Sequence, residues 1–182
     1  MIRYHRRLPH WHPAGEALFL TWCLKDSLPP SRRFPATSLT SGRAFAAVDR
    51  LLEETRSGNR WLARPEIARL VVYAIRNDDA SLKHYRLHAF VVMPNHVHLL
   101  VTPLVPVPRL LQSLKGATAR WANRMLGISG EAFWQDESYD RCVRDAEEFR
   151  RIQAYIERNP VRAGLAHNPE EYPWSSARRQ PD

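Results

Sequence analysis

The chain has 182 residues, 44% of them hydrophobic, which is typical of a single globular domain and excludes a disordered chain. No apolar run approaches the roughly 18 residues of a membrane span, and the N-terminus lacks the apolar stretch of a signal peptide, so we expect a cytoplasmic protein. Lys and Arg number 27 against 19 Asp and Glu, for a formal charge of +8, and with six Trp and six Tyr this composition fits nucleic-acid binding.

The first half of the chain predicts strands and helices in turn. Residues 16–24 are rich in β-branched and aromatic side chains and predict a strand, followed by a Pro-rich loop at 27–35. Thr40 or Ser41 caps a predicted helix that reaches about Thr55. Pro65 opens a second helix, whose inward residues are Ile67, Leu70, Val71 and Ala74. Two strands follow at 86–93 and 96–102, with a turn or bulge at Pro94-Asn95.

The second half begins with a change to helical periodicity at Val107. The predicted buried face of this helix consists of Leu110, Leu114, Ala117, Trp121 and Met125. Residues 133–145 predict a further strand, and Asp145 caps a last helix that Asn159-Pro160 ends. The tail after it is expected to pack three side chains onto the body, namely Leu165, Tyr172 and Trp174.

This order of elements predicts an α+β fold. Strands adjacent in sequence with helices between them suggest an antiparallel sheet with helices on one face. We expect one domain over residues 1–182, with a basic N-terminal arm at 1–15 and an irregular C-terminal tail at 160–182.

Two histidines interrupt the apolar strand at 96–102. Side chains at positions i and i+2 of a strand point to the same face, so His96 and His98 should lie side by side with Val97 on the other face. Two imidazoles on one rigid face form half of a metal site. The alternative is a pair of histidines on the exposed face of a sheet, without metal.

The last helix carries Tyr155 and Asn159 four residues apart, on one face. Each has an ordinary explanation: Tyr155 as an aromatic residue of the core, and Asn159 as the residue that ends the helix before a proline. Together with the histidines they permit a different chemistry. A divalent cation would polarise a phosphate oxygen, the Tyr155 hydroxyl would attack phosphorus, and the Asn159 carbonyl could be a third metal ligand. Manganese would suit imidazole ligands better than magnesium.

Several segments, taken in this order, resemble a known family. PNHVHLL is similar to the His-hydrophobic-His motif of HUH endonucleases, and YIERNPVRAGL to the catalytic helix of single-tyrosine transposases. The whole set most resembles the REP-associated tyrosine transposases, and it also includes RYHRRLPHWHPAGEALFLTWCLKDSLP, FVVMPNHVHLLVTP, LKGATARWANRMLG, FWQDESYDRCVRD and YPWSS. In two places the chain departs from relatives: Asn159 lies where insertion-sequence enzymes carry Gln, and Arg141 where relatives often carry His.

The resemblance implies a ferredoxin-like HUH fold and a bacterial transposase that cleaves and rejoins single-stranded DNA at hairpin elements. It implies that His96 and His98 bind Mg²⁺ or Mn²⁺, that Tyr155 forms a 5′-phosphotyrosine, and that the protein acts at the nucleoid as a monomer or homodimer without a membrane partner. The residues expected to grip DNA phosphates are Arg3, Arg6, Arg7, Lys115, Arg120 and Arg124. Two alternatives stay open, a catalytically silent hairpin-binding protein and a metal-binding protein that acts on RNA.

Overall fold

The computed structural model describes residues 15–27, 49–52 and 58–178. Residues 49–52 are helical. The Pro-rich loop, most of the helix expected at 40–55 and the N-terminal arm with Arg3, Arg6 and Arg7 lie outside the described residues. The remaining elements are β1 (Leu18–Cys23), η1 (Trp61–Ala63), α2 (Pro65–Ala80), β2 (Tyr85–Val92), β3 (His96–Pro103), α3 (Val107–Leu126), β4 (Tyr139–Cys142), α4 (Ala146–Arg162) and η2 (Pro169–Glu171).

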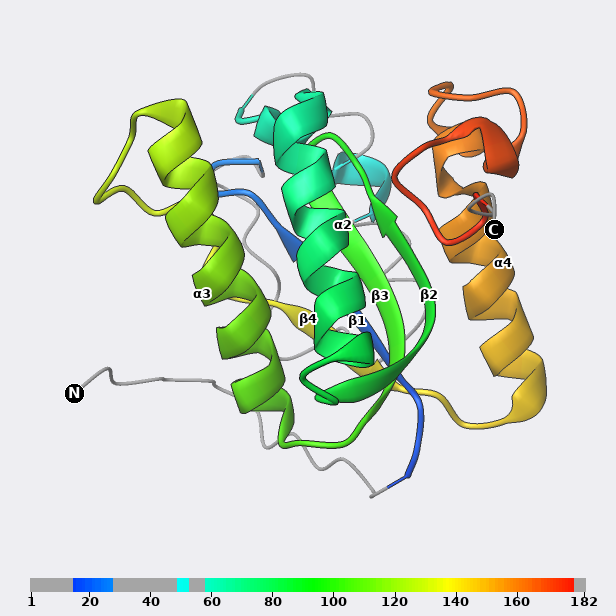
Figure 1. The fold of residues 1–182 in the computed structure, drawn as a ribbon. Helices are drawn as coiled ribbons and strands as arrows, with labels where there is room; N and C mark the ends of the chain where they lie inside the picture. The colour runs from blue at the N-terminus through cyan, green and yellow to red at the C-terminus, as the bar shows by residue number, and fades with distance from the viewer. Residues whose placement is uncertain (1–14, 28–48, 53–57, 179–182) are drawn as a thin grey trace.

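Four strands form one antiparallel sheet, as the sequence predicts, and their order is β2-β3-β1-β4 (Figure 1). β3 is a central strand, with Thr21 of β1 opposite His98 and Cys23 opposite His96. β4 is shorter than the expected strand at 133–145, because only residues 139–142 pair with β1. A separate bridge joins Leu24 to Trp134.

The helices cover both faces of the sheet, which corrects the expectation that they lie on one face. α2 and α3 pack on the face that carries Leu20, Val97 and Leu99. α4 packs on the opposite face, against Phe19 and Leu100 (Figure 1). The reason is visible in β3, whose residues 96–101 are all buried. A strand buried on both sides needs a layer of helix on each.

The buried face of α3 differs from the prediction beyond Leu114. The helix buries Leu110, Leu111, Leu114, Thr118 and Ala122. Trp121 and Met125, expected inward, are 53% and 47% exposed. After Leu114 the buried positions continue at Thr118 and Ala122, four residues apart. Thr118 can be buried because its hydroxyl accepts a hydrogen bond from Trp134 Nε1 at 2.9 Å. Hydrophobicity alone favours Trp121 over Thr118 and therefore selects the wrong face.

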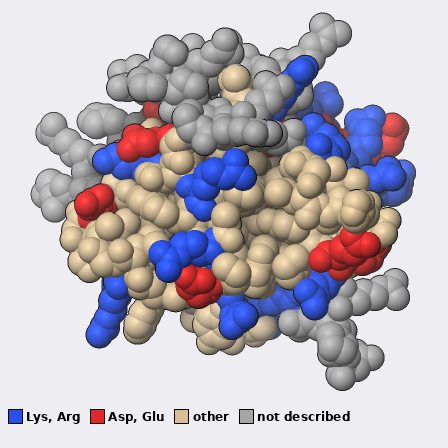
Figure 2. Space-filling model, turned by 90° about the horizontal axis from the view of Figure 1, so that it is seen from above, with Lys and Arg blue, Asp and Glu red and all other residues tan. Residues whose placement is uncertain are grey.

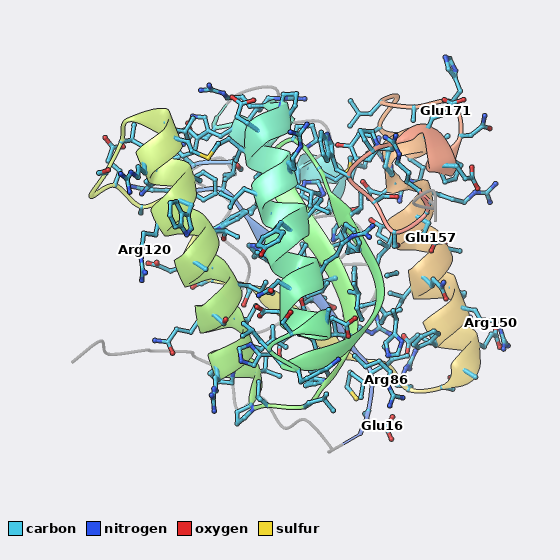
Figure 3. All side chains as sticks on the ribbon, viewed as in Figure 1. Glu16, Arg86, Arg120, Arg150, Glu157 and Glu171 are labelled. Carbon is cyan, nitrogen blue, oxygen red and sulfur yellow. The ribbon has the colours of Figure 1, made fainter. Side chains whose placement is uncertain are left out.

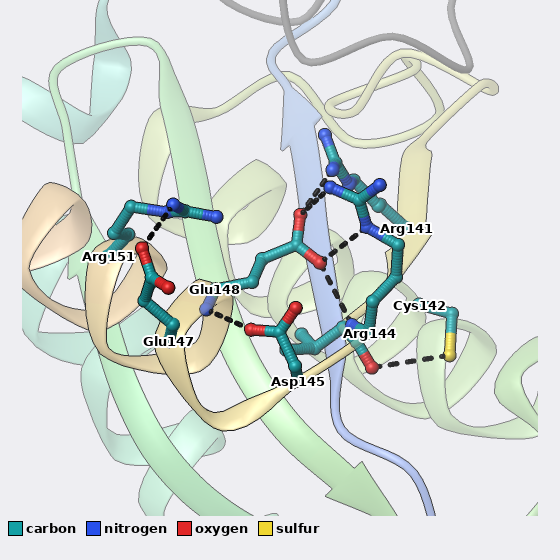
Figure 4. Close-up of polar contacts among 8 residues, drawn as sticks. Arg141, Cys142, Arg144, Asp145, Glu147, Glu148 and Arg151 are labelled. Carbon is teal, nitrogen blue, oxygen red and sulfur yellow. Dashed lines mark hydrogen bonds and ion pairs between the residues drawn. The ribbon is translucent and has the colours of Figure 1, made fainter.

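α4 begins where the sequence predicts and ends later. The Asp145 carboxylate accepts a hydrogen bond from the Glu148 backbone nitrogen at 2.7 Å, and Glu148 in turn binds Arg141 of β4 and Arg144 (Figure 4). Arg141 therefore ties the first turn of α4 to the sheet.

Pro160 lies inside α4 and does not stop it. The helix ends instead at Arg162, two residues before Gly164, which has a φ of 69°. There the Leu165 nitrogen donates to Pro160 O at 2.8 Å and the Gly164 nitrogen donates to Val161 O at 3.0 Å, a Schellman motif. A proline in the last turn removes one backbone donor and crowds one carbonyl, and the two hydrogen bonds of the Schellman motif keep the turn intact. The irregular tail consequently starts after residue 162 rather than at 160.

The tail packs partly as expected. The Tyr172 hydroxyl donates to Val92 O at 2.9 Å, and Trp174 packs against the core. Leu165 is 41% exposed, contrary to the prediction, because it follows the helix-ending glycine on the surface.

Candidate metal centre and nucleophile

β3 presents His96 and His98 on the face that α4 covers, with Val97 in the core on the opposite side. The two imidazole centroids are 4.7 Å apart, and both residues are fully buried. The same-face prediction is therefore confirmed. The alternative of two histidines on an exposed sheet face is wrong, because neither ring reaches solvent.

Asn95 fixes which nitrogen of His96 faces the site. Asn95 Nδ2 donates to the Leu52 carbonyl at 2.9 Å, so its Oδ1 is the atom directed at His96 Nδ1, 2.7 Å away. An amide oxygen only accepts hydrogen bonds, so Nδ1 of His96 carries the proton. Its Nε2 is then the nitrogen with a free lone pair, as a metal ligand requires. Nε2 makes no hydrogen bond to any part of the chain that the structure describes.

Asp49 completes the group, and sequence reasoning missed it. Its Oδ1 lies 2.9 Å from His98 Nε2 and 3.5 Å from His96 Nε2. Asp49, His96 and His98 thus offer three ligand atoms within 4.8 Å of one another. An ion with bonds of about 2.1 Å needs adjacent ligands roughly 3.0–3.4 Å apart, and the distances of 2.9 and 3.5 Å from Asp49 Oδ1 to the two Nε2 atoms lie just either side of that range. The sequence does hold a signal, since Asp49 is an acid three residues before Leu52, on the apolar stripe of its predicted helix.

His98 is held from its other side by the sheet. Its Nδ1 lies 2.8 Å from the Thr21 hydroxyl of β1, its direct partner in the strand register. Metal-binding histidines usually have such a partner on the second ring nitrogen, because it fixes the orientation of the ring. Both histidines therefore have an outer partner, Asn95 for His96 and Thr21 for His98.

The electrostatics keep His96 and Asp49 in the forms that bind metal. Burial, together with the neighbouring His98, lowers the pKa of His96 to about 3, so its ring is neutral at physiological pH. Burial acts to raise the pKa of Asp49, but the charge and hydrogen bond of His98, with His96 and Arg162, outweigh it and lower that pKa. A neutral imidazole and an ionised carboxylate are the states that a divalent cation selects.

The last helix brings Tyr155 to the same site within one chain. Its half-buried ring lies edge-on to His98, with 5.9 Å between ring centroids, and also contacts Phe19 at 6.4 Å. Asn159 is fully buried one turn later, and its Nδ2 donates to Asp49 Oδ2 at 3.3 Å. The predicted residues therefore meet in space, while a role for Asn159 as a ligand stays a prediction.

A family profile, Transposase IS200 like, matches residues 65–159, just over half of the chain. The chain belongs to the IS200-like transposase family. No curated protein matches it. Among solved structures, a REP-associated tyrosine transposase bound to a REP hairpin is similar at a TM-score of 0.59 and 17% identity, covering 97% of this chain and 82% of that one. A candidate transposase from Deinococcus radiodurans R1 is similar at a TM-score of 0.46 and 21% identity, covering 82% and 95%.

The family profile confirms the prediction of a transposase at the level of the IS200-like family, and the REP-associated transposase structure confirms the α+β fold. In this IS200-like transposase the predicted DNA-contacting residues on α3 lie on the other side of the sheet from the histidines. Arg120 points outward from α3, and Arg124 is also exposed (Figure 3). Lys115 is half-buried, with Nζ donating to Gln135 O at 2.6 Å and Asp136 O at 3.0 Å, so it anchors the loop before β4.

Among the described helices, none combines the length and hydropathy that crossing a bilayer requires.

Proposed function

We propose that this transposase is a metal-dependent single-stranded DNA endonuclease and strand transferase that cuts and rejoins DNA at hairpin elements. The observation that carries the proposal is the convergence, in one chain, of Asp49, His96 and His98 with the ring of Tyr155. The hairpin as substrate is supported by the similar fold of a transposase bound to a REP hairpin. Because DNA is the substrate, the proposed place of action is the cytoplasm, at the nucleoid.

His96 and His98 would hold a divalent cation, Mg²⁺ or Mn²⁺, through their Nε2 atoms, with Asp49 Oδ1 as the third ligand. Asn159 would orient Asp49 through its second carboxylate oxygen and remains a candidate further ligand through its own amide oxygen. When bound, such a cation supplies Lewis-acid polarisation of a phosphate oxygen. Asn95 and Thr21 would keep both imidazoles aligned.

Tyr155 would act as the nucleophile. Its hydroxyl oxygen forms a bond to phosphorus as the bond between phosphorus and the 3′ oxygen breaks. The phenol proton is released to solvent and the departing 3′ oxygen takes up a proton, leaving a free 3′ hydroxyl and a 5′-phosphotyrosine. Attack by a 3′ hydroxyl on this phosphotyrosine reverses the exchange and rejoins the strand. One phosphodiester replaces another at each step, so no ATP is needed.

Exposed cations would hold the DNA backbone. Helix α3 carries four cations and no acidic residue over Val107–Leu126, and Arg120 and Arg124 lie beside the exposed indole of Trp121. Lys and Arg are also spread over the face shown in Figure 2, with smaller groups of Asp and Glu between them. Arg3, Arg6 and Arg7 remain proposed contacts from the N-terminal arm. The charge of +8 favours a polyanion but does not distinguish DNA from RNA.

The decisive experiment is trapping of a covalent adduct. The full chain is incubated with Mn²⁺ and labelled hairpin oligonucleotides that carry randomised four-nucleotide flanks, and adducts that resist denaturant are resolved on a gel. We expect an adduct with wild type, none with Tyr155→Phe, and unchanged hairpin binding by that variant. Tyr73→Phe, on the exposed side of α2, is the matched control and should retain the adduct.

Each alternative predicts a different outcome. A silent hairpin-binding protein would bind the oligonucleotides and form no adduct with wild type. An RNA-directed protein would react with, or bind more tightly to, the RNA versions of the same hairpins. An adduct that persists in Tyr155→Phe would show that another residue is the nucleophile.

A further inference from the structure

The extension of α4 past Pro160 places a cation on the face of the nucleophile. Tyr155, Asn159 and Arg162 occupy positions i, i+4 and i+7 of one continuous helix, Ala146–Arg162. Residues at these spacings share a helix face. Had the helix stopped at Asn159, the direction of Arg162 would not follow from the sequence. The Schellman motif at Gly164 keeps the last turn intact.

The guanidinium of Arg162 contacts the ring of Tyr155 and lies close to the metal group. Its Cζ is 4.9 Å from the ring centroid, within the range of a cation–π contact. The ring of Tyr155 in turn lies edge-on to His98, with 5.9 Å between the ring centroids. Arg162 itself is exposed, so its head group borders both the candidate nucleophile and the solvent from which DNA arrives.

We propose that Arg162 binds a non-bridging oxygen of the scissile phosphodiester while Tyr155 attacks it; this rests on the proposed function. The charges of the groups at the site favour such a role. Two neutral imidazoles and one carboxylate reduce a divalent cation to a net charge of +1. The attack of an ionised phenol on a phosphodiester brings two negative charges together. A second positive charge is therefore required, and a guanidinium supplies it with donors that match phosphate geometry.

Arg162 also has a purely structural explanation, as a cation in the last turn that complements the helix dipole. The two roles predict different effects of substitution. Loss of a dipole partner lowers the free energy of unfolding by a small part of its total and leaves the rate of the chemical step unchanged. Loss of the phosphate-binding group slows the chemical step and leaves most of the hairpin affinity in place, because many other cations contact the backbone.

The test is a single-turnover rate of adduct formation in the full chain with Mn²⁺ and saturating labelled hairpin oligonucleotide. We expect Arg162→Ala to slow adduct formation roughly 100-fold or more, the effect typical of one donor to a developing oxyanion, while the hairpin Kd changes only a few-fold. Arg162→Lys should retain part of the rate. Added methylguanidinium should partly restore Arg162→Ala. The control is Arg150→Ala, an exposed arginine on the outer side of the same helix, away from Tyr155 (Figure 3).

Two results would overturn the proposal separately from the proposed function. If wild type forms the adduct and folded Arg162→Ala forms it at a similar rate, Arg162 has no role in the step. If Arg150→Ala slows the step equally, the effect is one of general charge. If wild type forms no adduct at all, the proposed function fails and this inference fails with it. A melting temperature for each variant separates unfolding from loss of chemistry.

Discussion

The hydrogen bond from His96 to Asn95 allows a quantitative test of the metal centre. Asn95→Ala removes the acceptor of His96 Nδ1–H at 2.7 Å and the donor to Leu52 O at 2.9 Å. Loss of an outer partner of a metal-binding histidine typically weakens metal affinity about 10–100-fold, or roughly 1.4–2.7 kcal/mol. Two buried polar groups also lose their partners, which should reduce the free energy of unfolding by about 2–4 kcal/mol.

Asn95→Asp separates these two effects. A carboxylate still accepts from His96 Nδ1–H and so keeps Nε2 available, but it no longer donates to Leu52 O. We therefore expect Asn95→Asp to lose stability and retain Mn²⁺ affinity, whereas Asn95→Ala loses both. Free Mn²⁺ measured by electron paramagnetic resonance gives the affinity, and denaturant unfolding without metal gives the stability. Wild-type Mn²⁺ affinity in folded Asn95→Ala would refute the tautomer argument.

Three further predictions concern the rest of the molecule. Asp49→Ala should weaken Mn²⁺ binding by more than Asn95→Ala does, measured in the same titration; equal affinity to wild type would remove Asp49 from the ligand set. Arg120→Ala should reduce the slope of log K against log salt for hairpin binding by about 0.9, and Arg150→Ala, on the outer side of α4 (Figure 3), should leave it unchanged. For Glu148, burial acts to raise the pKa, but hydrogen bonds from Arg144 and the charge of Arg141 lower it below its usual value. Its stabilising effect is thus present above about pH 4.5 and lost as the pH falls further, so wild type and Glu148→Gln should converge in unfolding free energy in acid; a constant difference would contradict the assignment.

Local periodicity was enough to predict which of these residues share a face on β3 and on α4. A spacing of two on an apolar strand places His96 and His98 together, and a spacing of four places Tyr155 and Asn159 together. The antiparallel sheet carries the histidine pair on the face that α4 covers, and this brings the two pairs into contact.

Asp49 could not be predicted in the same way. It reaches the histidines from a segment far from them in sequence, and no local pattern encodes that contact. Similarly, Thr118 is buried in α3 in place of Trp121 because of a hydrogen bond to Trp134, a residue of the loop beyond the helix. α4 passes Pro160 because its ending depends on the positive φ of Gly164. In each case a contact or backbone state outside the local pattern decided the outcome.

The most direct measurement is the identity of the residue that carries the DNA. The adduct formed by wild type with Mn²⁺ and hairpin oligonucleotide is digested with nuclease and protease, and the modified peptide is sequenced by mass spectrometry. We predict a 5′-nucleotide phosphate on Tyr155. A nucleotide on Tyr139, the half-buried tyrosine that also contacts Phe19, or on any other residue would contradict the assignment of the nucleophile.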